Sequence, residues 1–203
     1  NFARSKLLKG LVMVDIVLFG APGCGKGTQA QRLKEHYGID HVSTGEVIRA
    51  EIRRGTELGR SMAQYISEGK LAPDEIVIGM IGNYVAEHKD ARGCIFDGFP
   101  RTTVQAEAFD KILAEHGLKV DIMVDIHVPE EELVRRILLR GKDSGRADDA
   151  SEEVIRGRLD VYRMQTAVVA EYYAAQGKYA SVNGTGTMDE VFGRIAEVIG
   201  GLE

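Results

Sequence analysis

The sequence has few of the features that mark several large protein classes. It contains only two cysteines, Cys24 and Cys94, too few for a disulfide scaffold or a cysteine-based zinc site. No apolar run approaches the roughly 18 to 20 residues of a membrane helix. No Pro- or Ser-rich tract indicates disorder. We therefore expect one main folded domain with a substantial core and no membrane segment, in a reducing cytoplasm.

An excess of positive charge is also absent. The 203 residues include 26 Lys and Arg against 31 Asp and Glu, a formal charge of −5, which argues against a protein that coats nucleic acid. The total does not exclude small anionic ligands, because cationic side chains can gather in one cleft. Seven arginines do cluster between positions 135 and 163.

Short apolar runs alternate with helical patterns along the chain, which is typical of a parallel α/β sheet. The expected strands are Val14–Phe19, His41–Ser43, Gly93–Phe96, Val120–Val128 and Tyr179–Val182. One expected helix begins at Lys26 and ends before Gly38, and another has Pro73 in its first turn. The others span about Glu57–Glu68, Thr103–His116, Glu130–Arg140, Ser151–Ala175 and Met188–Ile199. The order predicts a doubly wound, five-stranded parallel sheet.

One expected strand has an unusual pattern. Between Val120 and Val128, aliphatic residues alternate with polar ones such as Asp121 and Asp125. Alternation marks a half-exposed strand, whereas a central parallel strand is apolar on both faces. This strand is therefore expected near an edge of the sheet, or with its polar face on a wet cleft.

The strongest motif is the segment from Gly20 to Thr28, with the sequence GAPGCGKGT. It follows an apolar strand and opens a helix, the context that a phosphate-binding P-loop requires. Its glycines let backbone N–H groups surround a phosphate, the helix N-terminus adds partial positive charge, and Lys26 adds a full charge. The alternative is a glycine-rich turn with an exposed lysine. The predicted phosphate contacts come from Gly23, Cys24, Gly25, Lys26, Gly27 and Thr28.

Two positions of this loop need separate interpretation. The Ser or Thr that usually follows the lysine is Gly27, and the hydroxyl comes one residue later, at Thr28. Direct binding of magnesium by Thr28 is therefore left open. Cys24 has no adjacent base in sequence, so we interpret it as a spacer rather than a catalytic thiol.

A P-loop alone is compatible with a GTPase, an ATPase or a small-molecule kinase. Three later segments narrow the choice: STGEVIR at 43–49, DGFPR at 97–101 followed by Gln105, and RGKDSGRADD at 140–149. In this order the chain resembles an adenylate kinase of the short-lid type, from about Val14 to Glu203. The resemblance implies a P-loop core at 14–203 with a helical NMP-binding region at 43–72 and a short lid at 139–150. Residues 1–13 are interpreted as an N-terminal extension.

The resemblance also implies site residues. Those expected to contact ATP, besides the P-loop, are Arg136, Arg140 and Gly186. Those expected to contact AMP are Thr44, Arg49, Lys70, Leu71, Ala72, Gly98, Phe99, Pro100, Arg101, Gln105, Arg146 and Arg158. The catalytic set is Lys26, Arg101, Arg136, Arg140, Arg146 and Arg158. Asp97, at the end of an expected strand, is assigned to magnesium through water.

Plainer interpretations compete at several positions. Arg49 could belong to a solvated helix face with Arg53 and Arg54, and Gly186 could be an ordinary loop glycine. Arg135, Arg156 and Arg163 are expected to be solvated, and Asp148 and Asp149 to hold the lid rather than a metal. The family usually has Asp where this chain has Glu46, which keeps the charge.

The nearest alternative within the resemblance is a UMP/CMP kinase. Those enzymes typically carry Ala at the position of Thr44 and Asn at that of Gln105, so both positions favour AMP. A GTPase would need a guanine-reading Asn-Lys-x-Asp segment, which is absent. A non-catalytic nucleotide-binding module would not need two sets of phosphate-binding arginines.

The implied activity is reversible phosphoryl transfer between MgATP and AMP to give two ADP. This reaction would serve adenine nucleotide homeostasis. The implied cofactor is Mg²⁺ with ATP, and no structural zinc is expected because the lid segment has no cysteine. The partners would be small nucleotides, with no nucleic acid or membrane, and the protein would be a monomer.

Overall fold

The computed structural model describes residues 14–88, 91–149 and 151–202, and it has the predicted α/β architecture. The strands are β1 (Ile16–Phe19), β2 (Asp40–Ser43), β3 (Cys94–Asp97), β4 (Ile122–His127) and β5 (Tyr179–Asn183). They form one parallel sheet in the order β2-β3-β1-β4-β5. The prediction of a doubly wound, five-stranded sheet is confirmed.

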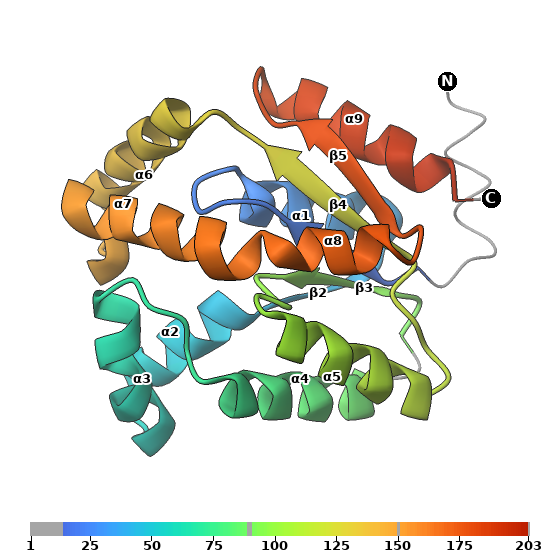
Figure 1. Cartoon of the computed structure of the whole chain (residues 1–203), viewed down its shortest axis with the longest axis horizontal. Coiled ribbons are helices and arrows are strands. Elements are labelled where there is room, and N and C mark those ends of the chain that lie inside the picture. Colours follow the sequence, from blue (N-terminus) through green and yellow to red (C-terminus); the bar gives the residue numbers. More distant parts are fainter. Residues whose placement is uncertain (1–13, 89–90, 150, 203) are drawn as a thin grey trace.

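Helices cover both faces of this sheet (Figure 1). They are α1 (Lys26–Tyr37), α2 (Thr44–Arg54), α3 (Glu57–Ser67), α4 (Asp74–His88), α5 (Thr103–Glu115), α6 (Glu130–Ser144), α7 (Glu152–Val161), α8 (Val168–Ala174) and α9 (Met188–Gly200). One core joins the sheet to α1, α6, α7 and α9, and a second joins its other face to α2, α3, α4, α5 and α8. Strand β1 lies at the centre of the sheet, with β3 and β2 on one side and β4 and β5 on the other. In such folds ligands bind at the carboxyl ends of the strands, near the point where the strand order reverses.

The position of β4 in the sheet accounts for its alternating sequence and agrees in part with the expectation that this strand lies near an edge. It lies between β1 and β5, one position in from the edge. Its aliphatic residues enter one core while Met123 is fully buried in the other. Asp125 is half-buried and accepts a hydrogen bond from the Tyr179 hydroxyl at 3.0 Å. Within β4, Asp125 is thus bonded to a neighbouring strand and His127 is exposed, so the strand is not exposed along a whole face.

The segment predicted as one helix, Ser151–Ala175, is helical over most of its length, but it is divided into α7 and α8. Between α7 and α8 the backbone forms a π-helical segment, Tyr162–Thr166. Such single-turn widenings are frequent at functional sites. Here Tyr162 and Thr166 both line a cavity that is also lined by the loop at 20–28.

A buried carboxylate fastens the amino ends of three strands. Oδ1 of Asp15 accepts the N–H of Cys94 at 2.9 Å, and the N–H of Asp15 donates to Oδ2 of Asp121 at 2.9 Å. Asp15 is 6% exposed. Burial raises the pKa of Asp15 to about 6; the N–H of Cys94 opposes this shift and the charge of Asp121 adds to it.

This geometry predicts the effect of Asp15→Asn on stability. A carboxyl whose folded-state pKa is raised stabilises the fold at pH below about 4, and this contribution is lost as pH rises through about 6. The Asn variant keeps an acceptor for Cys94 and gains a donor towards Asp121. We expect it to be more stable than the parent protein at pH 7.5, by up to roughly 3 kcal/mol, with the difference vanishing near pH 4.

Urea unfolding at several pH values checks this prediction. Glu115→Gln, which removes an exposed carboxylate, is the control and should not change the pH slope. A parallel loss of stability for Asp15→Asn at every pH would contradict the prediction, because it would indicate a purely structural defect.

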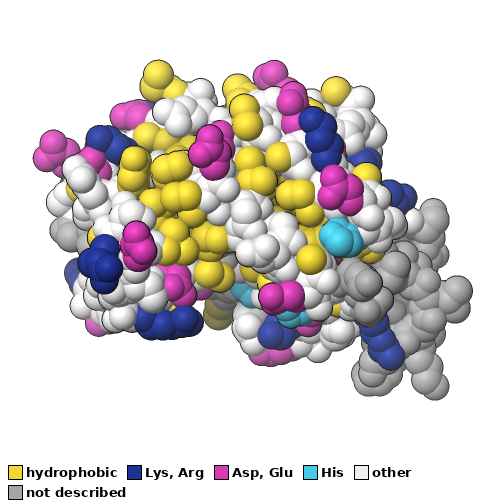
Figure 2. All heavy atoms as spheres, turned by 90° about the horizontal axis from the view of Figure 1, so that it is seen from below, with side chains coloured by type: hydrophobic (Ala, Val, Ile, Leu, Met, Phe, Trp, Pro, Cys, Tyr) yellow, Lys and Arg dark blue, Asp and Glu magenta, His cyan; other side chains and the backbone are white. Residues whose placement is uncertain are grey.

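Seen from the side of α4 and α5, hydrophobic side chains occupy much of the middle of the surface, with charged side chains mostly around them (Figure 2). Helix α4 contributes to this hydrophobic surface, because Ile76, Ile78 and Met80 are only partly buried. No helix within the described ranges is long and apolar enough to cross a membrane.

Candidate active site

A cavity of about 610 Å³ lies at the carboxyl ends of β1, β2 and β3. The sequence-predicted site residues that line it are Gly23, Cys24, Gly25, Lys26, Gly27, Thr28, Arg49, Leu71, Asp97, Gly98, Phe99, Pro100, Arg101, Arg136, Arg140, Arg146, Arg158 and Gly186. The fold therefore gathers segments that are up to about 160 positions apart in sequence around one space.

The P-loop is shaped by close packing at its glycines. A Cβ on Gly20 would lie 2.7 Å from the carbonyl oxygen of Ile126, and one on Gly23 would lie 2.7 Å from Cγ1 of Ile137. Gly25, at the N-cap of α1, has a φ of 102° and no side chain to satisfy the first N–H groups of the helix. These N–H groups and the helix dipole form a site for anionic oxygen atoms.

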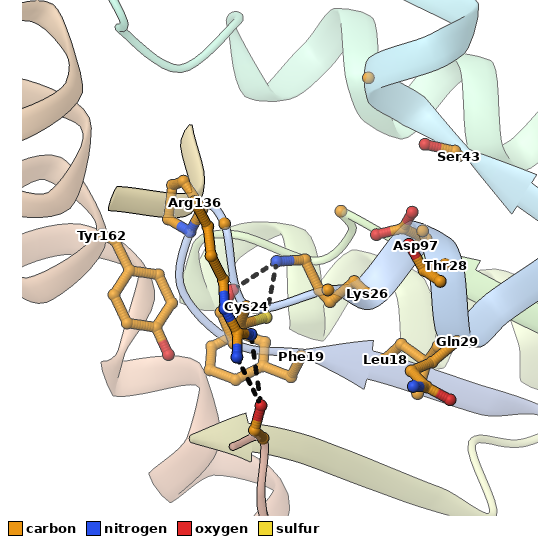
Figure 3. A pocket seen from close by; sticks show the side chains of 18 of the residues that line it. Leu18, Phe19, Cys24, Lys26, Thr28, Gln29, Ser43, Asp97, Arg136 and Tyr162 are labelled. Atoms are coloured by element: carbon orange, nitrogen blue, oxygen red, sulfur yellow. Dashed lines mark hydrogen bonds between the residues drawn. The ribbon is translucent and has the colours of Figure 1, made fainter. Parts of the chain in front are cut away.

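Hydrogen bonds keep the ammonium group of Lys26 at this loop. Its Nζ donates to the carbonyl oxygens of Gly20 at 2.6 Å and Ala21 at 3.1 Å, and it lies 3.5 Å from Sγ of Cys24 (Figure 3). Cys24 is 2% exposed, in keeping with its interpretation as a spacer. A phosphate in the loop would meet the lysine charge and the helix N-terminus together.

Arginines reach the cavity from several different elements. Arg49 comes from α2, Arg101 follows β3, and Arg158 comes from α7. Burial lowers the pKa of Arg101, and the nearby charges of Arg158 and Arg49 lower it further. Several cationic side chains that line one cavity favour an anionic ligand there, and planar guanidinium groups suit phosphate oxygens.

Two buried aspartates orient Arg140, which is in the predicted lid, and Arg158, which is on α7. Arg140 makes a bidentate pair with Asp149, at 2.7 and 2.8 Å, and Arg158 donates to the same carboxylate at 2.8 Å. Arg158 also pairs with Asp148 at 3.0 Å. The Asp149 side chain is fully buried. These pairs fit the expectation that both aspartates hold the lid.

By contrast, three arginines of this part of the chain have side chains that are 43–65% exposed and pair with acidic residues on the surface: Arg135, Arg156 and Arg163. Their predicted solvation is confirmed.

Arg136 occupies the other end of the cavity. Its Nε donates to Glu132 at 2.7 Å, and both terminal nitrogens lie 3.2 Å from the carbonyl oxygen of Gly184 (Figure 3). Gly186 and Met188 line the cavity beside it. Glu132 and Gly184 therefore fix the orientation of the flat guanidinium, which lines the cavity, and an aromatic base can stack on such a group.

Asp97 supplies a carboxylate next to the P-loop. Its Oδ2 lies 3.7 Å from the point where a Cβ on Gly27 would stand, and Thr28, the next residue, lines the same cavity (Figure 3). Burial would raise the pKa of Asp97, but His41 and Lys26 hold it below the ordinary value of an aspartate. An ionised carboxylate and a hydroxyl are oxygen ligands that suit Mg²⁺ bound mainly through phosphates and water.

Over the described ranges, no group of three or more His, Cys, Asp or Glu side chains has the geometry of a metal site made by the protein alone.

Four predicted site residues do not line the cavity: Thr44, Lys70, Ala72 and Gln105. Thr44 is buried and donates to the carbonyl oxygen of Gly98 at 2.9 Å. Lys70 is largely exposed and pairs with Glu68. Gln105 is 1% exposed, and the protein itself hydrogen-bonds both ends of its amide.

Comparisons with known proteins agree with this geometry. A family model described as "Adenylate kinase" matches residues 18–178. The adenylate kinase of Bacteroides thetaiotaomicron is 54% identical over 187 residues, 92% of this chain and 98% of that protein. The adenylate kinase of Flavobacterium johnsoniae is 45% identical over 190 residues, 94% of this chain and all of that protein. The chain belongs to the adenylate kinase family.

In this adenylate kinase-family chain the structure adds site residues that the sequence did not indicate. His41 lines the cavity, with Nε2 3.7 Å from Oδ2 of Asp97. Glu46 accepts from both Arg49 and Arg146, so it links the predicted NMP-binding region to the predicted lid. Although burial opposes it, bonding to Arg49 and the charge of Arg146 lower the pKa of Glu46. Only the departure from Asp at position 46 marked this residue in sequence.

Proposed function

We propose that this adenylate kinase-family protein transfers a phosphoryl group reversibly between MgATP and AMP, giving two ADP. The observation that carries the proposal is one cavity with two cationic sets. The P-loop with Lys26 forms one set, and Arg49 and Arg101 belong to the other. In this proposal the protein acts as a monomer on free nucleotides.

Each phosphate has its own set of residues. Lys26 and the P-loop N–H groups hold the ATP phosphates, with Arg136 flanking the ATP base beside Gly186. Arg49 and Arg101 hold the AMP phosphate. Arg140, Arg146 and Arg158 line the same cavity and offset the charge on the transferring group. Asp97, with Thr28 beside it, orients the water shell of the magnesium that arrives with ATP.

The chemistry needs little from the protein besides position and charge. The AMP phosphate is itself the nucleophile, so no strong general base is required. Holding both substrates in line removes much of the entropic barrier. A closed lid excludes water, which strengthens the charge interactions and suppresses hydrolysis of ATP.

A coupled assay of ADP formation tests the proposal. ATP is supplied with AMP, CMP, UMP or GMP in turn, with and without magnesium. We expect rapid, magnesium-dependent turnover with AMP and much slower turnover with the other acceptors. No ADP above background with any acceptor would favour a non-catalytic nucleotide-binding module instead, and a preference for CMP or UMP would favour the pyrimidine alternative.

A further inference from the structure

The loop 184–187 joins β5 to α9 (Figure 1) and lies beside Arg136. Gly184, Gly186 and Thr187 all line the cavity that also contains the P-loop. The carbonyl oxygen of Gly184 already accepts hydrogen bonds from the guanidinium of Arg136. Gly186 is exposed, so a ligand in the cavity can contact its backbone.

Arg194, on α9, holds two carbonyl groups of this segment. Its Nη1 donates to the carbonyl oxygens of Asn183 and Thr185, at 2.7 Å in each case. Within residues 14–88, 91–149 and 151–202, no other group hydrogen-bonds to the peptide between Thr185 and Gly186. In this part of the chain, the orientation of that peptide therefore depends on Arg194.

Two peptide planes meet at Gly186, and each is fixed at its far end. The peptide between Thr185 and Gly186 is trans, so its C=O and N–H point in opposite directions. Its C=O faces Arg194, and the N–H of Gly186 therefore points away from Arg194. In the next peptide the N–H of Thr187 donates to Oε2 of Glu190 at 2.7 Å, which directs the C=O of Gly186 away from Glu190. Neither polar group of Gly186 bonds to another described residue, so this glycine offers a ligand one donor and one acceptor in fixed directions.

We propose that Arg194 is a positioning residue that selects the base of the phosphoryl donor by fixing the direction of the Gly186 N–H. This inference rests on the proposed function, in which the ATP base lies beside Arg136 and Gly186. The φ of Gly186 is 101°, and glycine adopts positive and negative φ about equally readily. Without Arg194 the peptide before Gly186 can therefore turn over, and the Thr185 carbonyl then replaces the N–H as the group that faces the base.

The direction of this peptide separates two bases of nearly the same shape. Adenine presents an acceptor at N1 beside an amino donor at N6, whereas hypoxanthine presents a donor at N1 beside an oxygen acceptor. The N–H and C=O of Gly186, held in one order, match only one of these edges. A site built to hydrogen-bond its ligand rejects the mismatched one strongly. Arg194 thus favours ATP over ITP by keeping the order that matches adenine.

The test is the ratio of kcat/KM for ATP to kcat/KM for ITP, with AMP saturating, in Arg194→Met and Arg194→Lys. Methionine keeps an apolar stem but has no N–H to donate, so the peptide is released. We expect the ratio to fall by about 10-fold, the scale of one net hydrogen bond. KM for ATP should rise while KM for AMP stays the same, because the residues proposed to bind AMP lie on other elements. Lysine carries three donors and should restore most of the ratio.

Arg32→Met is the matched control. Arg32 also pairs with α9, but its partner is the exposed side chain of Asp189 rather than the loop. The substitution removes the same charge and should leave the ATP-to-ITP ratio unchanged. An unchanged ratio in Arg194→Met, or an equal fall in Arg32→Met, overturns the proposal. Loss of thermal stability in Arg194→Met without a change of the ratio does so too, because it would assign Arg194 a purely structural role.

NMR of the parent protein gives a second readout that does not depend on how the variants fold. On addition of ATP, the amide proton of Gly186 should shift downfield more than those of Thr185 and Thr187, and ITP should produce a smaller shift. Equal shifts with the two nucleotides, or no shift with either, would contradict the proposal. Absence of ADP formation by the parent protein with ATP and AMP would instead overturn the proposed function, and the NMR comparison would still test the contact at Gly186.

Discussion

Replacing Lys26 with methionine should reduce ADP formation by about 10³-fold, the scale on which single charge-stabilising groups act in phosphoryl transfer. Methionine has a similar length and no charge, so the variant tests the charge rather than the volume of the side chain. The loss should appear mainly in kcat, because the lysine interacts most strongly with the charge that develops as the phosphoryl group moves.

The fold should survive this substitution. The hydrogen bonds of Lys26 Nζ go to carbonyl oxygens of the loop itself, not to a distant part of the core. Thermal unfolding by circular dichroism checks this point. Lys34→Met removes the same charge from the exposed last turn of α1 and should retain normal turnover. Near-normal turnover in Lys26→Met would show that the loop does not hold the transferred phosphates.

The P-loop and the sheet could be predicted because their signals are local. The spacing of Gly20, Gly23 and Gly25 before Lys26 can be read within one strand–loop–helix unit, although the close contacts that require glycine at Gly20 and Gly23 come from the distant residues Ile126 and Ile137. Similarly, apolar runs of strand length between helical patterns suffice for a parallel sheet. The arginines could be assigned only through the resemblance, since many of them also fit a solvated face.

Other features depend on contacts that no local pattern contains. The bond between Asp74 and Gln105 joins residues 31 positions apart, and that between Glu46 and Arg146 joins residues 100 positions apart. The π-helical turn Tyr162–Thr166 is another such feature, because the sequence on both sides of it has the ordinary periodicity of an α-helix. The position of His41 beside Asp97 follows from the pairing of β2 with β3, which the sequence does not fix residue by residue.

Asp149→Asn should impair both stability and turnover, because a single buried carboxylate neutralises two arginines. The Asp149 side chain is fully buried, and its two oxygens accept three hydrogen bonds from Arg140 and Arg158. Burial would raise the pKa of Asp149, but these arginines lower it, so the group is ionised in the fold. Asparagine keeps the shape but removes the charge and turns an amide donor towards a guanidinium.

Removing one partner of a buried ion pair typically costs about 3 kcal/mol, which corresponds to a fall of roughly 6–12 °C in Tm for a chain of this size. Turnover should fall by about 10²-fold, because both arginines lose the contact that orients them towards the transferring phosphoryl group. Calorimetry and steady-state kinetics at a temperature well below both Tm values keep the two effects separate.

Asp143→Asn provides the matched control, since it removes an exposed carboxylate from the same segment and should change neither quantity. A variant of Asp149 that loses stability but keeps normal kcat would show that the carboxylate supports the fold without positioning the arginines. Loss of kcat with unchanged stability would show the reverse, that the desolvated pair contributes no net folding energy and exists to orient Arg140 and Arg158. The expected combination of both losses follows from one carboxylate whose oxygens face the two arginines at once.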